Sequence, residues 1–194
     1  MEKDRFPEGA DLGRYRNYLR LLARVQLGAR PGGKLDASDL VQQTLLEAYQ
    51  KRAQFRGTVE SERAAWLRTI LARNVTDALR AAGRLKRDVC RERSLEQALA
   101  ASSVRIGAWL AAEGPTPSEQ AQRHEQAIRL ADALSRLPGD QREALVLHYW
   151  QGCTLAEVGT HLERTVSAVA GLLKRGLKNL REQLEAPDRG RSES

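Results

Sequence analysis

The side chains best suited to catalysis or metal binding form no recognised pattern in this 194-residue sequence. The histidines and cysteines lie far apart in the chain, and neither cysteine belongs to a CxxC pair: Cys90, His124, His148, Cys153 and His161. No GxxxxGK[ST], GxSxG or HExxH segment occurs, so nucleotide hydrolysis and the common hydrolase chemistries have no motif to support them. We therefore expect a protein that is not an enzyme, with no catalytic residues, cofactor or metal.

Basic residues offer a different chemistry, which is the binding of polyanions. The chain has 32 Lys and Arg against 25 Asp and Glu, a net charge of +7, and such an excess favours nucleic acid or an acidic partner. Between Arg164 and Arg181 there are five basic residues and no acidic one. The segment 61–87 carries seven basic residues against two acidic ones, a net +5.

The segment 154–181 has the pattern of a helix-turn-helix. Thr154 followed by Glu157 forms a capping box that starts one helix, and Thr165 can cap the second. Gly159 supplies the small residue needed where two helices cross. Glu163 stands where the turn usually favours Gly, at a cost of about 1 kcal/mol for a non-Gly residue at positive φ, so a looser turn is expected. A plain helical hairpin with solvated basic residues is the alternative.

The elements that must position these residues are all helical, because apolar residues recur every three or four positions and alternating runs are absent. We predict an all-α fold of two small helical domains joined by a flexible linker, the C-terminal one containing the helix-turn-helix. The predicted parts are an N-terminal domain, a Gly-, Pro- and Ser-containing linker of net charge −2, a C-terminal domain and a tail: 1–87, 88–122, 123–184 and 185–194. Within the first, helices are expected over 12–28, 36–54 and 61–82.

The second of these helices has two distinct faces. Its predicted buried stripe consists of Val41, Leu45, Ala48 and Tyr49. Leu46 falls on the opposite, polar face, where an apolar residue is compatible with a protein-docking surface, although a single exposed Leu is also normal.

The third helix places Trp66 near the start of its basic run. A tryptophan there can stack on an unpaired base, a contact worth roughly 1–3 kcal/mol in single-strand binders. A core position is the alternative, since Trp66, Ile70 and Asn74 also follow helical spacing.

Three segments in order, "DASDLVQQTLLEAYQ", "AAWLRTILARNVTDALR" and "LADALSRLPGDQREALVLHYWQGCTLAEVGTHLERTVSAVAGLLKRGLKNLREQL", resemble the sigma-70-type transcription initiation factors of the extracytoplasmic-function (ECF) group. The resemblance covers about 14–87 and 125–184. It implies an N-terminal domain of the kind called region 2, which docks on core RNA polymerase and opens the promoter −10 element. It also implies a C-terminal, region-4-like domain that holds the −35 element of promoter DNA. An anti-sigma factor is a further partner that the resemblance suggests.

By position, the resemblance assigns residues to three surfaces. The polymerase contact would use Asp39, Gln42, Gln43 and Leu46. The helix beside the melted −10 strand would use Trp66, Asn74, Asp77 and Arg80, with the loop 55–61 at a pocket for an extruded base. The −35 contact would use small residues near the bases and basic residues on phosphates: Arg164, Thr165, Ser167, Ala168, Lys174, Arg175 and Lys178.

One departure and two alternatives accompany this interpretation. Family recognition helices often carry Lys or Arg where this chain has Ala170, Gly171 and Leu172, which puts base reading by those positions in doubt. The first alternative is a helix-turn-helix regulator that binds duplex DNA without being a polymerase subunit. The second is a helical adaptor or anti-factor, with which the positive charge agrees poorly.

The sequence also predicts where the protein acts. No apolar run approaches the roughly 20 residues that a membrane span requires, and the N-terminus is charged rather than signal-like. We expect a soluble cytoplasmic protein that is associated with the nucleoid through RNA polymerase.

Overall fold

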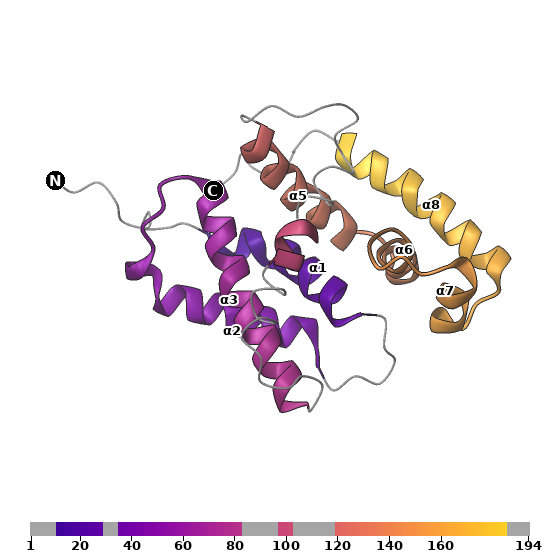
Figure 1. Cartoon of the computed structure of the whole chain (residues 1–194). Helices are drawn as coiled ribbons and strands as arrows, with labels where there is room; N and C mark the ends of the chain where they lie inside the picture. Colours follow the sequence, from indigo (N-terminus) through magenta and orange to yellow (C-terminus); the bar gives the residue numbers. More distant parts are fainter. Residues whose placement is uncertain (1–10, 29–34, 83–96, 103–118, 186–194) are drawn as a thin grey trace. The chain divides into compact units, whose positions relative to one another are not determined.

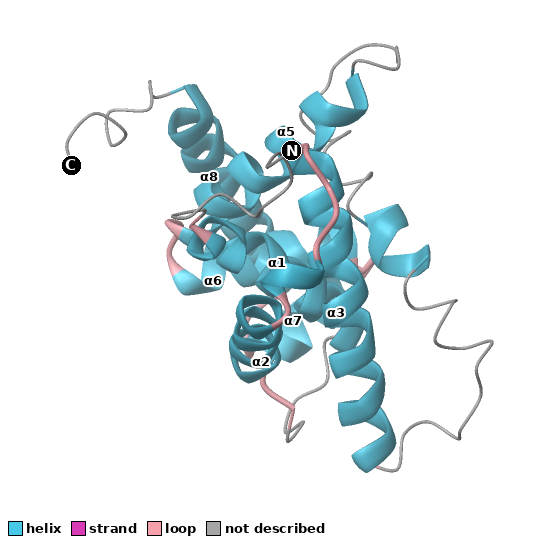
Figure 2. Cartoon of the chain, turned by 90° about the vertical axis from the view of Figure 1, so that its left-hand side faces the viewer, coloured by secondary structure: helices cyan, strands magenta, loops and turns pink. Residues whose placement is uncertain are grey.

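The computed structural model describes residues 11–28, 35–82, 97–102 and 119–185, without the side chains of 119–123. All regular elements in these ranges are helices (Figures 1 and 2), as predicted for an all-α fold. The chain divides into two compact units, residues 1–128 and 129–194, and each is considered by itself below.

The first unit is built around three α-helices (Figure 1). A short 3-10 helix, η1 (Leu12–Tyr15), leads into α1 (Arg16–Leu27). The other elements are α2 (Ala37–Gln50), η2 (Arg52–Gln54) and α3 (Glu60–Ala81). The ends predicted from the sequence agree within a few residues, and Asp36 caps α2 by accepting a hydrogen bond from the Ser38 amide at 2.7 Å.

The core of this unit lies between α1, α2 and α3. Its largest fully buried side chains come mainly from α1 and α3: Tyr15, Tyr18, Leu19, Leu22, Leu67, Ile70 and Leu71. The predicted stripe of α2 is partly wrong. Val41 and Ala48 are buried as expected, but Leu40 and Thr44 take the places expected for Leu45 and Tyr49. Tyr49 instead points to the surface, since positions 37, 41, 44 and 48 already complete the stripe that faces the core.

A part of the predicted linker packs within the first unit. Residues 97–102 are helical, with Leu99 and Ser102 fully buried. The Gln26 amide donates to the Ser102 hydroxyl at 3.3 Å. Arg14 forms ion pairs with Glu60 at 2.7 Å and with Glu125 at 2.8 Å, so the beginning of α5 (Glu119–Ser135) also contacts η1.

The second unit contains the end of α5 and the elements α6 (Gly139–Leu145), η3 (Val146–Trp150), α7 (Leu155–Leu162) and α8 (Val166–Glu185). The η3 segment is a π-helical turn that continues α6. The buried side chains come from every helix of the unit: Leu130, Leu134, Leu145, Val158, Val169 and Leu180. This small core fixes the face that α8 turns to solvent.

Candidate polymerase and nucleic-acid interfaces

One face of α2 is exposed over three turns, and we call it the α2 face. It consists of Asp39, Gln42, Gln43, Leu46, Tyr49 and Gln50, all of them exposed. Leu46 and Tyr49 are the large apolar members, at 59% and 57% exposure, and the guanidinium of Arg52 lies 4.3 Å from the centre of the Tyr49 ring. The four residues predicted as a polymerase contact therefore share one surface. Sequence reasoning missed Tyr49, although its position three residues after Leu46 was a usable signal.

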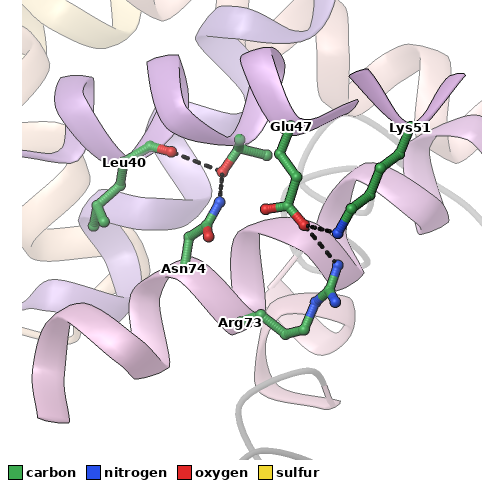
Figure 3. A network of polar contacts seen from close by, with 6 residues as sticks. Leu40, Glu47, Lys51, Arg73 and Asn74 are labelled. Atoms are coloured by element: carbon green, nitrogen blue, oxygen red, sulfur yellow. Dashed lines mark hydrogen bonds and ion pairs between the residues drawn. The ribbon is translucent and has the colours of Figure 1, made fainter. Parts of the chain in front are cut away.

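Asn74 holds α3 to α2 from inside the core. Its side-chain amide donates to the Thr44 hydroxyl at 3.1 Å, and that hydroxyl donates to the Leu40 carbonyl at 2.7 Å (Figure 3). Asn74 is 6% exposed. The Asn74 amide is thus engaged in the core and has little accessible surface, and its contact with the −10 strand stays a prediction.

Glu47 joins the same two helices at their rim. Its carboxylate accepts from Lys51 at 2.6 Å and from Arg73 at 3.0 Å (Figure 3). Burial alone would raise the pKa of Glu47, but the hydrogen bond from Lys51 and the charges of Arg73 and Lys51 outweigh it and lower that pKa. The cluster fixes the inner side of α2 while its outer side remains free of these contacts.

The basic residues of α3 that the structure describes have partners within the first unit, on other helices or, for Arg80, on α3 itself. Arg68 donates to the Tyr18 hydroxyl at 3.0 Å, and Arg80 lies 3.4 Å from Asp77. Tyr15 has its pKa raised to about 12, chiefly by burial, with Arg63 acting in the opposite direction. Some of the basic residues predicted to form a positive surface are thus engaged in contacts within the first unit. The remaining basic residues of the run, at 84, 86 and 87, lie outside the described residues.

Trp66 lies beside the loop that precedes α3. Its ring centre is 5.2 Å from that of Phe55, at an interplanar angle of 43°. Phe55 is buried and Trp66 is half-buried. The Trp66 ring therefore packs against the core and also keeps part of its surface accessible. Glu62 holds the loop by accepting from the amides of Thr58 and Val59 at 2.8 and 3.2 Å.

The helix-turn-helix is formed by α7 and α8. The hydroxyl of Thr154 accepts from the Glu157 amide at 3.3 Å, and the Glu157 carboxylate accepts from the Thr154 amide at 2.8 Å, which is the predicted capping box. The carboxylate also accepts from the Thr154 hydroxyl at 2.9 Å, and the two hydrogen bonds that it accepts from Thr154 lower the pKa of Glu157. A Cβ on Gly159 would lie 2.7 Å from the Arg164 carbonyl oxygen, which confirms that only a glycine fits there. Glu163 takes the left-handed conformation at φ 55°, so the turn is tight rather than loose.

The residues predicted to contact the −35 element lie in α8 or just before it, and most are exposed to solvent. Six of the seven are exposed: Arg164, Thr165, Ser167, Lys174, Arg175 and Lys178. The seventh, Ala168, is half-exposed. The Thr165 hydroxyl accepts from the Ala168 amide at 3.2 Å and so caps α8 as expected. Arg164 is paired with Asp140 at 3.2 Å, and Lys178 lies 3.9 Å from Glu182. Both pairs are exposed.

Two of the histidines make contacts within the second unit. His148 Nδ1 lies 2.8 Å from the Cys153 carbonyl oxygen, and His161 faces Glu143 at 3.8 Å. Within the described ranges, no group of three or more His, Cys, Asp or Glu could hold a metal ion. Among the helices described, none is both long and apolar enough to cross a membrane.

Comparison with known families shows which family the chain belongs to. The sequence model for sigma-70 region 2 matches residues 14–85, and the one for sigma-70 region 4 matches residues 127–180. The chain belongs to the sigma-70 family. The region 2 match contains the α2 face and all of α3, and the region 4 match contains the helix-turn-helix.

Curated relatives are themselves sigma factors. The chain is 30% identical over 148 residues to a probable RNA polymerase sigma factor, RfaY, of Xanthomonas campestris pv. campestris, covering 76% of this chain and 34% of the relative. It is 28% identical over 154 residues to the ECF RNA polymerase sigma factor SigE of Mycolicibacterium smegmatis, covering 79% and 53%. The chain thus spans about half the length, or less, of these sigma-70 relatives.

A solved structure is similar as well. It is the co-crystal structure of the sigma factor RpoE in complex with the anti-sigma factor NepR from Bartonella quintana. The identity is 22%, with 87% of this chain and 90% of that one covered and a TM-score of 0.33. The sigma-70 assignment rests on the two region matches and not on this likeness.

Proposed function

We propose that the chain is a sigma factor that binds core RNA polymerase, recognises promoter −10 and −35 elements and promotes DNA strand opening. The observation that carries the proposal is the match to regions 2 and 4, in that order, on one chain. In this proposal the N-terminal domain, 1–87, binds polymerase and the −10 element, and the C-terminal domain, 123–184, binds the −35 element. The protein would act in the cytoplasm, on the nucleoid.

The α2 face is the proposed polymerase contact. Its members are exposed, and the hydrogen bonds and ion pairs that link α2 to α3 lie on the other side of α2. Leu46 and Tyr49 supply apolar area of the kind found at the centre of protein interfaces, and Asp39 and the glutamines supply a polar rim. Burial of both apolar side chains against a partner would contribute about 1.5–3 kcal/mol each at full burial.

A paired substitution tests this contact. The variant Asp39→Lys with Leu46→Arg should lower the amount of core polymerase recovered with the chain by more than tenfold, while far-ultraviolet circular dichroism is unchanged because both side chains are exposed. Glu185→Lys, an exposed charge change on α8, is the control and should bind normally. Equal recovery by all three proteins would remove the α2 face from the proposal.

The proposed −10 contact comprises Trp66, Asp77 and Arg80, together with Asn74, which holds α3 to α2. Trp66 keeps an accessible edge beside the Phe55 loop, and Asp77 is exposed with Arg80 next to it. Arg80→Ala should leave the closed complex nearly intact but lower open-complex formation, read as permanganate reactivity of unpaired thymines. A promoter with a pre-opened bubble should restore part of the activity, because the bases are already unstacked. Normal melting by Arg80→Ala would exclude this role for Arg80.

The proposed −35 contact is the exposed face of α8. Lys174, Arg175, Lys178 and Arg164 would neutralise phosphates, and the small residues Thr165, Ser167 and Ala168 would lie close to the bases. A helix-turn-helix places the N-terminal part of its second helix against base edges in the major groove. The polymerase-binding test separates this function from the alternative of a duplex-binding regulator, since only a sigma factor needs the α2 face for promoter activity.

A further inference from the structure

The N-terminal half of the recognition helix is unusual in what it lacks. From Val166 to Leu173 α8 has no charged side chain, and Ser167 is the one residue there whose side chain can form a hydrogen bond. The neighbouring Thr165 hydroxyl already accepts from the Ala168 amide at 3.2 Å. The bidentate pairs that read guanine or adenine require Arg, Lys, Asn or Gln. This part of α8 therefore cannot read bases mainly by hydrogen bonds.

The same stretch exposes apolar surface. Val166, the first residue of α8, is 49% exposed, and Ala170 is exposed one turn later. Val169, between them, is fully buried, which fixes the rotation of α8 about its axis. Val166 and Ala170 therefore stay on the outer face whatever the helix approaches.

These two residues lie on one line with the basic residues of the helix. Val166, Ala170, Lys174 and Lys178 follow each other at steps of four, and all four are exposed. The line is thus apolar over its first two members and cationic over its last two. This arrangement matches that of DNA, in which the base edges lie within the major groove and the charged phosphates line its sides.

We propose that Val166 and Ala170 contact the C5-methyl groups of thymines in the promoter duplex. Thymine is the one base that presents an apolar group in the major groove, and apolar side chains are its usual partners. This end of α8 would then select T·A pairs by methyl contact, with Ser167 as its single direct hydrogen-bonding reader. The inference rests on the proposed function, in which α8 enters the major groove. A protein partner fits the strip less well, because it offers only one Val and one Ala beside two lysines.

Deoxyuridine substitution tests this contact directly. Duplex promoters are first selected from a random library with core polymerase and the full chain, and each conserved upstream thymine is then replaced by deoxyuridine, which lacks only the methyl group. At one or two positions the replacement should weaken promoter binding about fourfold, the effect of losing one buried methyl. 5-Bromodeoxyuridine, whose bromine replaces the methyl group, should restore binding.

The protein variant completes the cycle. With Val166→Ala the deoxyuridine effect should fall below about 1.5-fold at one of these positions. Because Val166 is half exposed, circular dichroism should remain that of a folded helical protein. The inference is overturned if no upstream thymine methyl matters, or if Val166→Ala remains fully sensitive to its loss. It is also overturned if Val166→Ala weakens polymerase binding instead, which would assign the strip to a protein partner. Failure to select any promoter would count against the proposed function itself. The deoxyuridine comparison, in contrast, tests only the methyl contact.

Discussion

At the scale of single residues, Asn74 carries the clearest consequence for mutagenesis. Its amide bridges α3 to the Thr44 hydroxyl of α2 inside the core. Asn74→Ala should lower the free energy of unfolding of the first unit by about 1–3 kcal/mol, since a buried hydroxyl loses its donor. Urea denaturation followed by tryptophan fluorescence measures this. Asp77→Ala, an exposed change one turn later, is the control and should cost less than about 0.5 kcal/mol. Equal stability of both variants would contradict the bridging role.

The ion pairs of Glu47 predict how the stability of the protein depends on pH. Its pKa in the folded protein is lowered from the ordinary value of 4.5. A group with a depressed folded pKa contributes stability above its unfolded pKa, and that contribution is lost as the pH falls through the folded value. Glu47→Gln should therefore be less stable than the wild type at pH 7, by less than about 1 kcal/mol because Arg73 is half exposed and screened by water. The difference should shrink on acidification below 4.5, and a difference that grows instead would contradict the assignment.

Residue roles were predictable from the sequence only where the cause is local. The Asp36 cap, the Thr154 and Glu157 pair and the need for Gly159 depend on neighbours within a few positions, and the structure has all of them. Tyr49 was misplaced, and the hydrogen bond between Asn74 and Thr44 was not foreseen, because the surroundings of both residues depend on how α2 and α3 rotate against each other. Where polar and apolar residues both occur at the edge of a helix face, the sequence pattern does not show which of them turn toward the neighbouring helix.

At the scale of elements, the crossing of α7 and α8 should tolerate no side chain. Gly159→Ala would bring its Cβ to 2.7 Å from a backbone oxygen, so we expect a loss of about 1–3 kcal/mol from overpacking. Gly171→Ala is the matched control. There the added Cβ meets only the end of the Arg175 side chain at 3.2 Å, and replacing a helical Gly should stabilise by up to about 1 kcal/mol. Thermal unfolding distinguishes the two, and similar melting temperatures would contradict the close approach.

The basic residues just before and within α8 predict how DNA binding should depend on salt. If Arg164, Lys174, Arg175 and Lys178 each neutralise one phosphate, the logarithm of the binding constant of the full chain for duplex DNA should fall with the logarithm of salt concentration, with a slope of about −3 to −4. Lys174→Ala should reduce the slope by about 1. A flat salt response would favour a helical hairpin whose basic residues are merely solvated.

At the scale of the whole molecule, helix content and order followed from periodicity, because each helix must bury one face and its repeat is visible in the sequence. The resemblance to sigma-70 factors added the functional surfaces, and the matches to regions 2 and 4 confirm the family. The packing of residues 97–102 within the first unit was not predicted, since a single buried Leu99 leaves no periodic signal. The predicted domain limits stay predictions.

The central claim is that this chain gives core RNA polymerase promoter specificity. Run-off transcription on a promoter library, with core enzyme alone, core enzyme with the chain, and core enzyme with the Asp39→Lys and Leu46→Arg variant, measures it most directly. We expect discrete transcripts only with the unaltered chain, and a loss of more than tenfold with the variant. Specific binding of the chain to duplex DNA together with no chain-dependent transcript would contradict the claim and favour a duplex-binding regulator.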